Sequence, residues 1–244
     1  MDLQTIRYKL NNITDERGLS SERKYLSMSQ IGDCPRGLYD QLVASIDGTA
    51  RRSIGKEHQF ALDKEIKAAV RERLRVVELL RAWETFEIVA SFNGALDDRV
   101  RGHLDGEFED GALLHVKPTR VETLDAIRNN PRYNIPRRHF EQVQMYLRHG
   151  EYDCARIVYI ARENGDLWLS EIHADERTQD RLDEKAQNVL IAVERREPPV
   201  CICRRHSTEI PRPPRRAERI LVDAAPAPKI DPRAWQKLKH VRHR

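Results

Sequence analysis

The chain has 244 residues, enough for one medium-sized domain with appendages. Charged residues make up 34% of it and hydrophobic residues 39%, and its net charge is only +4, which by itself identifies no nucleic-acid partner. No apolar run is long enough to cross a bilayer, and the first residues, 1–4, lack the basic-then-apolar layout of a signal peptide. Four cysteines do not suggest a secreted disulfide scaffold, so we expect a reducing, cytoplasmic compartment.

Apolar periodicity predicts a succession of helices and strands between two polar ends. The predicted core spans residues 28–196, between a polar segment at 1–27 and a Pro/Arg-rich segment at 197–244. In chain order the core holds a helix after Pro35 as far as 46, a helix at 55–74, strands at 86–90, 99–108 and 112–117, a helix at 137–149, strands at 155–161 and 166–173, and a helix at 178–196. This order indicates an α/β fold with a mixed central sheet flanked by helices.

The basic C-terminal segment admits two interpretations. Clustered Arg and Lys side chains attract phosphates through counterion release. The same composition is typical of a solubilising end, and charge alone does not separate the two.

One predicted hairpin gathers polar side chains. If residues 109–111 form a three-residue loop with Gly111 in the left-handed region, Asp105 lies directly opposite His115. Because side chains alternate along a strand, Asp105, His115 and Lys117 then share one face. An acid, an imidazole and an amine at one point form a coherent site for a divalent cation and a positioned lysine.

The opposite face of the same hairpin is apolar. We expect Leu104, Leu114 and Val116 to pack together there against a core. We also expect Pro118 to end the second strand just after Lys117.

These residues resemble a known enzyme superfamily. Asp105, followed by a strand that ends in Lys117, is similar to the PD-(D/E)XK nuclease motif. Three further segments resemble its RecB-like and CRISPR-associated exonuclease branch: the Gly-x-x-His helix at 55–58, the Gln-x-x-x-Tyr helix at 142–146 and the Cys-Pro-Arg segment at 29–36. The resemblance covers residues 28–173 and implies a restriction-endonuclease-like core and a metal-dependent nuclease that acts on DNA.

The resemblance also implies a role for each matching residue. Its metal ion, Mg²⁺ or Mn²⁺, would be held by His58, Asp105 and His115, with the backbone carbonyl of Val116 as a further ligand. Lys117 would assist the attacking water.

Gln142 and Tyr146 lie four residues apart and share a helix face. The resemblance implies that they position the substrate strand or support Lys117. The structural alternative is that they cap the core.

Other site residues also have structural alternatives. His58 could be a core histidine, Asp105 a turn residue beside Gly106, and Lys117 a solvated lysine at a strand end.

His115 departs from the family pattern, which has Asp or Glu at that position. Histidine favours softer metals than Mg²⁺, so the site could prefer Mn²⁺, bind metal weakly or be degenerate. Glu107, on the same predicted strand face as Asp105, could supply a carboxylate. The alternative function is a nucleic-acid-binding module that has lost cleavage, or a subunit of a recombination or replication complex.

The cysteines allow a second kind of site. Some relatives hold an iron–sulfur cluster with one early and three late cysteines, and Cys34 would match the early one. The late part of the chain offers only Cys201 and Cys203, with His206 nearby, and Cys-x-Cys spacing suits a cluster poorly. We therefore expect buried or reduced thiols, with Cys154 in the core.

Overall fold

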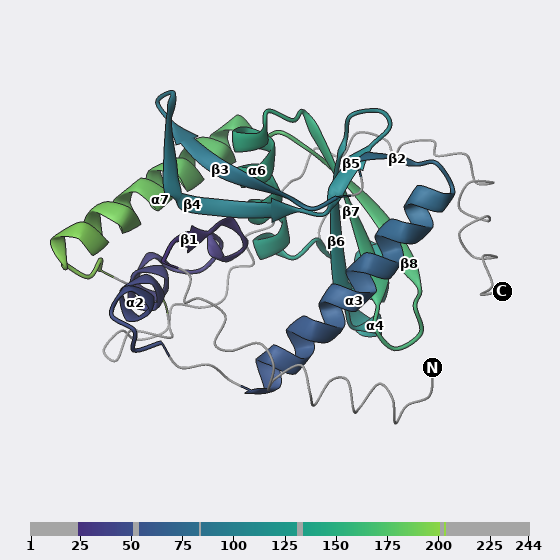
Figure 1. The fold of residues 1–244 in the computed structure, drawn as a ribbon, viewed down its shortest axis with the longest axis horizontal. Helices are drawn as coiled ribbons and strands as arrows, with labels where there is room; N and C mark the ends of the chain where they lie inside the picture. Colours follow the sequence, from purple (N-terminus) through teal and green to yellow (C-terminus); the bar gives the residue numbers. More distant parts are fainter. Residues whose placement is uncertain (1–23, 51–53, 83, 131–133, 201–202, 204–244) are drawn as a thin grey trace.

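The computed structural model describes residues 24–50, 54–82, 84–130, 134–200 and 203, and of residues 54–58 and 96 the backbone only (Figure 1). Most of the two predicted end segments lies outside these ranges, so the division into three segments stays a prediction. The strands are β1 (Leu26–Ser27), β2 (Leu80–Ala82), β3 (Phe86–Phe92), β4 (Ala95–Leu104), β5 (Gly106–Phe108), β6 (Leu113–Thr119), β7 (Cys154–Ala161) and β8 (Leu167–His173). The helices are η1 (Met28–Gln30), α2 (Pro35–Ile46), α3 (Ile54–Val76), α4 (Val121–Asn129), α6 (Arg137–Gly150) and α7 (Glu176–Arg195).

The strands form two mixed sheets. One has the order β1-β4-β3 and the other the order β2-β5-β6-β7-β8. The β1–β4 and β6–β7 pairs are parallel, and the other neighbours are antiparallel. The predicted α/β class, with mixed sheets flanked by helices, is confirmed, and the strands divide over two sheets.

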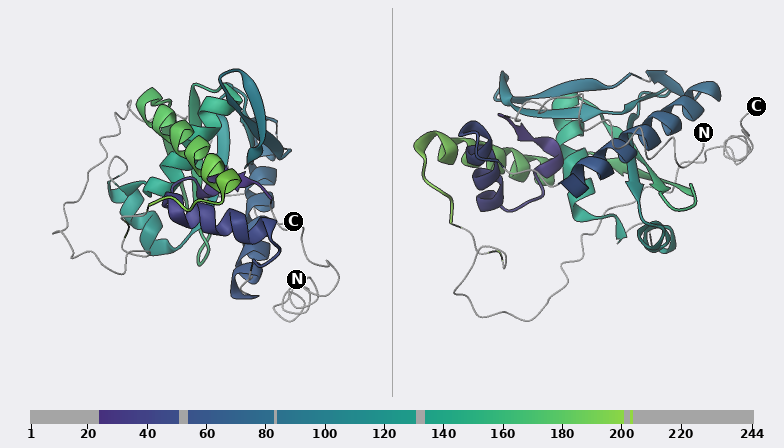
Figure 2. Two further views of the ribbon diagram at one scale, coloured as in Figure 1. Left: turned by 90° about the vertical axis from the view of Figure 1, so that its left-hand side faces the viewer. Right: turned by 60° about the horizontal axis from the view of Figure 1, so that its bottom comes forward.

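Two apolar clusters lie on opposite faces of the five-stranded sheet. The larger one joins the sheet to α2, α4, α6, α7 and the three-stranded sheet, and includes the buried Tyr146 and Tyr159. The smaller one, around Val70 and Leu74, packs α3 against β6 and β7. Figures 1 and 2 show α2 and α7 together at one end of the molecule and α3 along the other. None of the helices in the described part of the chain is long and apolar enough to cross a membrane.

The hairpin that joins β5 to β6 has the predicted geometry. Gly111 has a φ of +82°, in the left-handed region that favours glycine. Gly106 pairs with Leu114 and Glu107 with Leu113, which is the expected register. The N–H of Asp105 donates to the carbonyl of Leu114 at 3.3 Å, so Asp105 lies beside His115.

The chain passes from one sheet to the other at Asp105. β4 ends at Leu104, and β5 begins at Gly106, whose φ of 149° is unusual for a residue with a side chain. Leu104 therefore packs in the larger cluster, whereas Leu114 and Val116 pack in the smaller one. The prediction of one shared apolar face was wrong because it assumed a continuous strand.

β6 also continues past its proline. It pairs with β7 as far as Thr119, and Pro118 lies opposite Ile160, so the expectation that Pro118 ends the strand was wrong. The N–H of Val116 points away from β7, toward Asp105. The nitrogen of Pro118, two residues later, faces the same side, so its missing N–H removes no bond to β7.

A close approach between β4 and α6 depends on Gly102. A Cβ atom at this position would overlap the ring of Tyr146 and lie 2.8 Å from the sulfur of Met28. The absence of a side chain at Gly102 thus lets Tyr146 lie directly against β4.

We predict that Gly102→Ala lowers the free energy of unfolding by about 1–3 kcal/mol, because an added methyl group overpacks the contact with Tyr146. Urea unfolding followed by circular dichroism measures this change. Asp98→Ala, at an exposed position of the same strand, is the control and should change stability by less than about 0.5 kcal/mol. Equal stability of Gly102→Ala and the control would contradict the proposed packing.

Candidate active site

Asp105 is a buried carboxylate at the junction of the two sheets, with 4% of its surface exposed. Its Oδ2 accepts the N–H of Val116 at 2.9 Å and lies 2.9 Å from Nδ1 of His115. The ammonium group of Lys67, in α3, lies 3.0 Å from Oδ1 and 3.1 Å from Oδ2. Burial alone would raise the pKa of Asp105, but His115, Lys67 and the Val116 N–H hold this pKa well below its usual range. The carboxylate is therefore ionised at neutral pH.

His115 is buried and neutral. Burial and the charge of Lys117 lower its pKa to about 4, although Asp105 opposes the shift. Its ring meets the ring of Tyr146 edge-on, with centroids 5.4 Å apart. Nε2 has no hydrogen-bond partner among the described residues. A neutral imidazole is the form that can bind a metal ion.

Lys117 is held by a glutamine from α6. Its Nζ donates to Oε1 of Gln142 at 2.7 Å, and Nε2 of Gln142 donates to the hydroxyl of Tyr146. Burial and the charge of Lys67 lower the pKa of Lys117 to about 7, against the opposing effect of Asp105. Near neutral pH, part of the population is therefore the neutral amine, which can accept a proton from water.

The structure thus brings together five of the predicted site residues: Asp105, His115, Lys117, Gln142 and Tyr146. The expected shared face of Gln142 and Tyr146 is present, and both are buried within α6. Val116 lies between His115 and Lys117 with its N–H on Asp105. The chemical roles of these residues stay predictions.

Two other candidate site residues, His58 and Glu107, are not among the described side chains that meet at Asp105. The side chain of His58 lies outside the described residues. Glu107 accepts the hydroxyl of Tyr152 at 3.3 Å and pairs with Arg81, so it does not supply the missing carboxylate. Among the side chains that the structure describes, no third His, Cys, Asp or Glu lies close enough to Asp105 and His115 to complete a three-ligand group.

The contact between Lys67 and Asp105 was not predicted from the sequence. Lys67 lies nine residues after His58, about 13–14 Å farther along α3. Its neighbour on the helix, Asp63, is paired with Arg162 at 2.8 and 2.9 Å. From sequence, Asp63 and Lys67 form an i,i+4 pair, which is typical of a solvated helix surface. Both instead reach partners far along the chain.

In the metal-free protein the Nδ1–H of neutral His115 donates to Oδ2 of Asp105. A divalent cation bound between these two atoms would replace that proton. Their separation of 2.9 Å is close to the ~3.0 Å expected between neighbouring ligands of an octahedral ion with ~2.1 Å bonds. Lys67 places a monovalent cation on the same carboxylate. The mixed oxygen and nitrogen donors favour Mn²⁺ over Mg²⁺.

The early cysteine of the possible iron–sulfur set has a structural contact. The sulfur of Cys34 accepts the N–H of Gly37 at 3.3 Å at the start of α2, where Pro35 occupies the first turn. Cys201 lies outside the described residues.

The lowered pKa values of His139 and His115 predict a stability that falls as the pH is lowered. Burial, together with Lys117 and His115, lowers the pKa of His139 to about 3, so the folded protein keeps it neutral while the unfolded chain takes up a proton below pH 6.5. Between pH 7.5 and 5, His139 alone should remove up to about 2 kcal/mol of unfolding free energy.

Thermal unfolding across this range tests the prediction. His139→Gln should show a smaller loss of stability toward pH 5 than the wild type, with part of the loss remaining because His115 acts in the same direction. His103→Gln, on β4, is the matched exposed control. An unchanged pH profile in His139→Gln would contradict the assignment.

The fold is shared with a solved nuclease, whereas no family model and no curated protein sequence matches the chain. The alkaline exonuclease LHK-Exo from Laribacter hongkongensis is similar over 72% of this chain and 91% of its own, with a TM-score of 0.57 and 12% identity. LHK-Exo in complex with dAMP matches over the same shares with a TM-score of 0.57 and 13% identity. At such low identity the likeness concerns the fold, and the chain has an α/β fold similar to that of this exonuclease.

Proposed function

We propose that this protein is a metal-dependent nuclease that hydrolyses phosphodiester bonds in DNA. The observation that carries the proposal is the position of Lys117: a half-buried amine, fixed by Gln142, beside the Asp105–His115 pair. The likeness to an exonuclease solved with dAMP supports the same reaction class. The more specific assignment to the RecB-like branch rests on the segments at 55–58, 142–146 and 29–36.

Each residue would have a separate part in the reaction. Asp105 and His115 would hold the cation with the Val116 carbonyl and His58, and the bound cation would supply a hydroxide near neutral pH and stabilise charge on the phosphate. Lys117 would orient the attacking water and accept its proton, because its lowered pKa leaves part of it neutral.

The α6 residues would act on Lys117 rather than on the cation. Gln142 would fix the position of Nζ, and Tyr146 would fix Gln142 through its hydroxyl. The contact of Tyr146 with the His115 ring would keep the imidazole beside Asp105. These contacts and the burial of both side chains favour a supporting role for Gln142 and Tyr146.

A second candidate function is DNA binding without cleavage. His115 replaces the expected acid, and Lys67 already neutralises Asp105. In that case labelled DNA would bind but remain uncut with either Mg²⁺ or Mn²⁺, and His115→Glu would introduce cleavage.

We predict that Lys117→Ala lowers the rate of DNA cleavage by at least about 100-fold, because it removes the proton acceptor beside the cation site. The measurement is hydrolysis of linear double-stranded DNA by the full chain with Mg²⁺ or Mn²⁺. A chelator should abolish cleavage by the wild type.

Lys64→Ala is the matched control, because Lys64 is an exposed lysine of α3. It should cleave like the wild type. Full activity in purified, folded Lys117→Ala would refute the assigned role.

A separate prediction concerns the cation site without reference to activity. Lys67→Met should lower the free energy of unfolding by about 1–3 kcal/mol in chelator, because Asp105 loses a charged donor. Mn²⁺ should then raise the melting temperature of Lys67→Met more than that of the wild type, because the ammonium group no longer competes for Asp105. Lys64→Met is the control, and an equal Mn²⁺ response in all three proteins would contradict competition between Lys67 and a cation at Asp105.

A further inference from the structure

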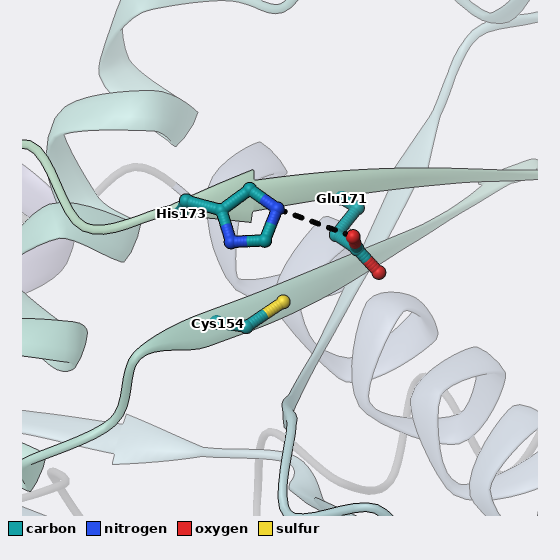
Figure 3. A group of neighbouring side chains, drawn as sticks. All are labelled: Cys154, Glu171 and His173. Atoms are coloured by element: carbon teal, nitrogen blue, oxygen red, sulfur yellow. Dashed lines mark ion pairs between the residues drawn. The ribbon is translucent and has the colours of Figure 1, made fainter. Parts of the chain in front are cut away.

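A second group of metal-binding side chains lies on the β7–β8 hairpin. Cys154 and His173 face each other across the two strands, and Glu171 lies two residues before His173 on the same face. Figure 3 shows the three side chains pointing toward one another, and one ligand atom of each lies within 4.8 Å of the others. Nε2 of His173 is 3.2 Å from Oε1 of Glu171.

This group is separate from the Asp105 site. Cys154 packs against the smaller apolar cluster, on the α3 side of the five-stranded sheet. His115 and Lys117 instead contact Tyr146 and Gln142 of α6, on the other side. A cation bound at one group therefore does not use the ligands of the other.

Arg156 orients the glutamate of this group. Its Nε donates to Oε2 of Glu171 at 3.0 Å, and its other nitrogens hold both oxygens of Asp110 at 2.6 and 2.8 Å. Asp110 offsets the charge of Arg156, and Oε1 of Glu171 remains directed at His173. A carboxylate ligand held by a neighbour through its other oxygen is a common arrangement around protein-bound metals.

We propose that Cys154, Glu171 and His173 bind one borderline-soft divalent cation of the zinc class. Thiolate, imidazole and carboxylate are the donors that Zn²⁺ uses, and three of them leave a fourth tetrahedral position for water. His173 is 46% exposed at its side chain, so this fourth position faces solvent. The bound ion would join the first residue of β7 to the last residue of β8 and close the open end of the hairpin.

Binding includes one proton-transfer step. Burial and the charge of Glu171 raise the pKa of Cys154 to about 12, so the free side chain is a thiol at neutral pH. The cation forms a bond to sulfur, the S–H bond breaks, and the proton passes to solvent. Oxidation states do not change.

The experiment is a titration of the metal-free full chain with Co²⁺, read by the absorbance of thiolate-to-cobalt charge transfer. This signal reports sulfur ligation, so Co²⁺ bound at Asp105 and His115 does not contribute to it. The wild type should develop the absorbance to one equivalent of Co²⁺ and lose it when Zn²⁺ is added. Failure of the nuclease proposal would leave this result unchanged.

Three variants locate the site. Cys154→Ser should abolish the absorbance, and His173→Gln, at an exposed position, should weaken Co²⁺ binding at least tenfold. Cys34→Ser is the control and should retain the signal, because serine also serves at the start of a helix. Absence of the band in the wild type, its persistence in Cys154→Ser or unchanged affinity in His173→Gln would overturn the proposal, with circular dichroism establishing that each variant is folded.

Discussion

The structure depends on how the buried negative charge of Asp105 is compensated. Removing a carboxylate from water costs several kcal/mol unless donors replace the lost hydration. Here the donors come from separate parts of the fold: Lys67 from α3, and the Val116 N–H and His115 from β6. The charge therefore links the helix on one side of the sheet to the strand at its centre, at the point where the chain leaves the other sheet.

The groups that compensate the charge of Asp105 also set the protonation states that metal binding and catalysis require. Asp105 stays ionised and His115 stays neutral, and the two atoms that a cation would bind in place of the Nδ1 proton lie 2.9 Å apart in a site shielded from water. The charge of Lys67 lies close enough to Lys117 to disfavour a second positive charge there, and this repulsion adds to burial in lowering the pKa of Lys117 to about 7. A divalent cation that displaced Lys67 would replace one positive charge with two, while Gln142 continued to hold Lys117.

The parts of the site that the sequence predicted are those formed by residues close together along the chain. The hairpin register follows from Gly111 and from strand alternation, so Asp105 and His115 could be paired without knowledge of the fold. Lys67 could not be found in this way, because its partner lies 38 residues away and its helix position resembles a solvated one.

For the fold, too, only elements with a clear local sequence pattern were predicted. The helix at 35–46 was predicted from Pro35 and its apolar spacing, whereas β1 and β2 have only two and three residues and carry no readable pattern. The change of sheet at Asp105, which separates Leu104 from Val116, depends on tertiary packing. The short helix α4 was also missed, because nine residues give too few turns for a clear period.

Crystals of the wild-type protein soaked in Mn²⁺ provide the most direct test of whether a cation binds at Asp105 and displaces Lys67. We expect an anomalous-scattering peak within bonding distance of Asp105 and His115, with the ammonium group of Lys67 moved off the carboxylate. Lys67 still seated on Asp105, with no peak beside that carboxylate at saturating Mn²⁺, would contradict this expectation.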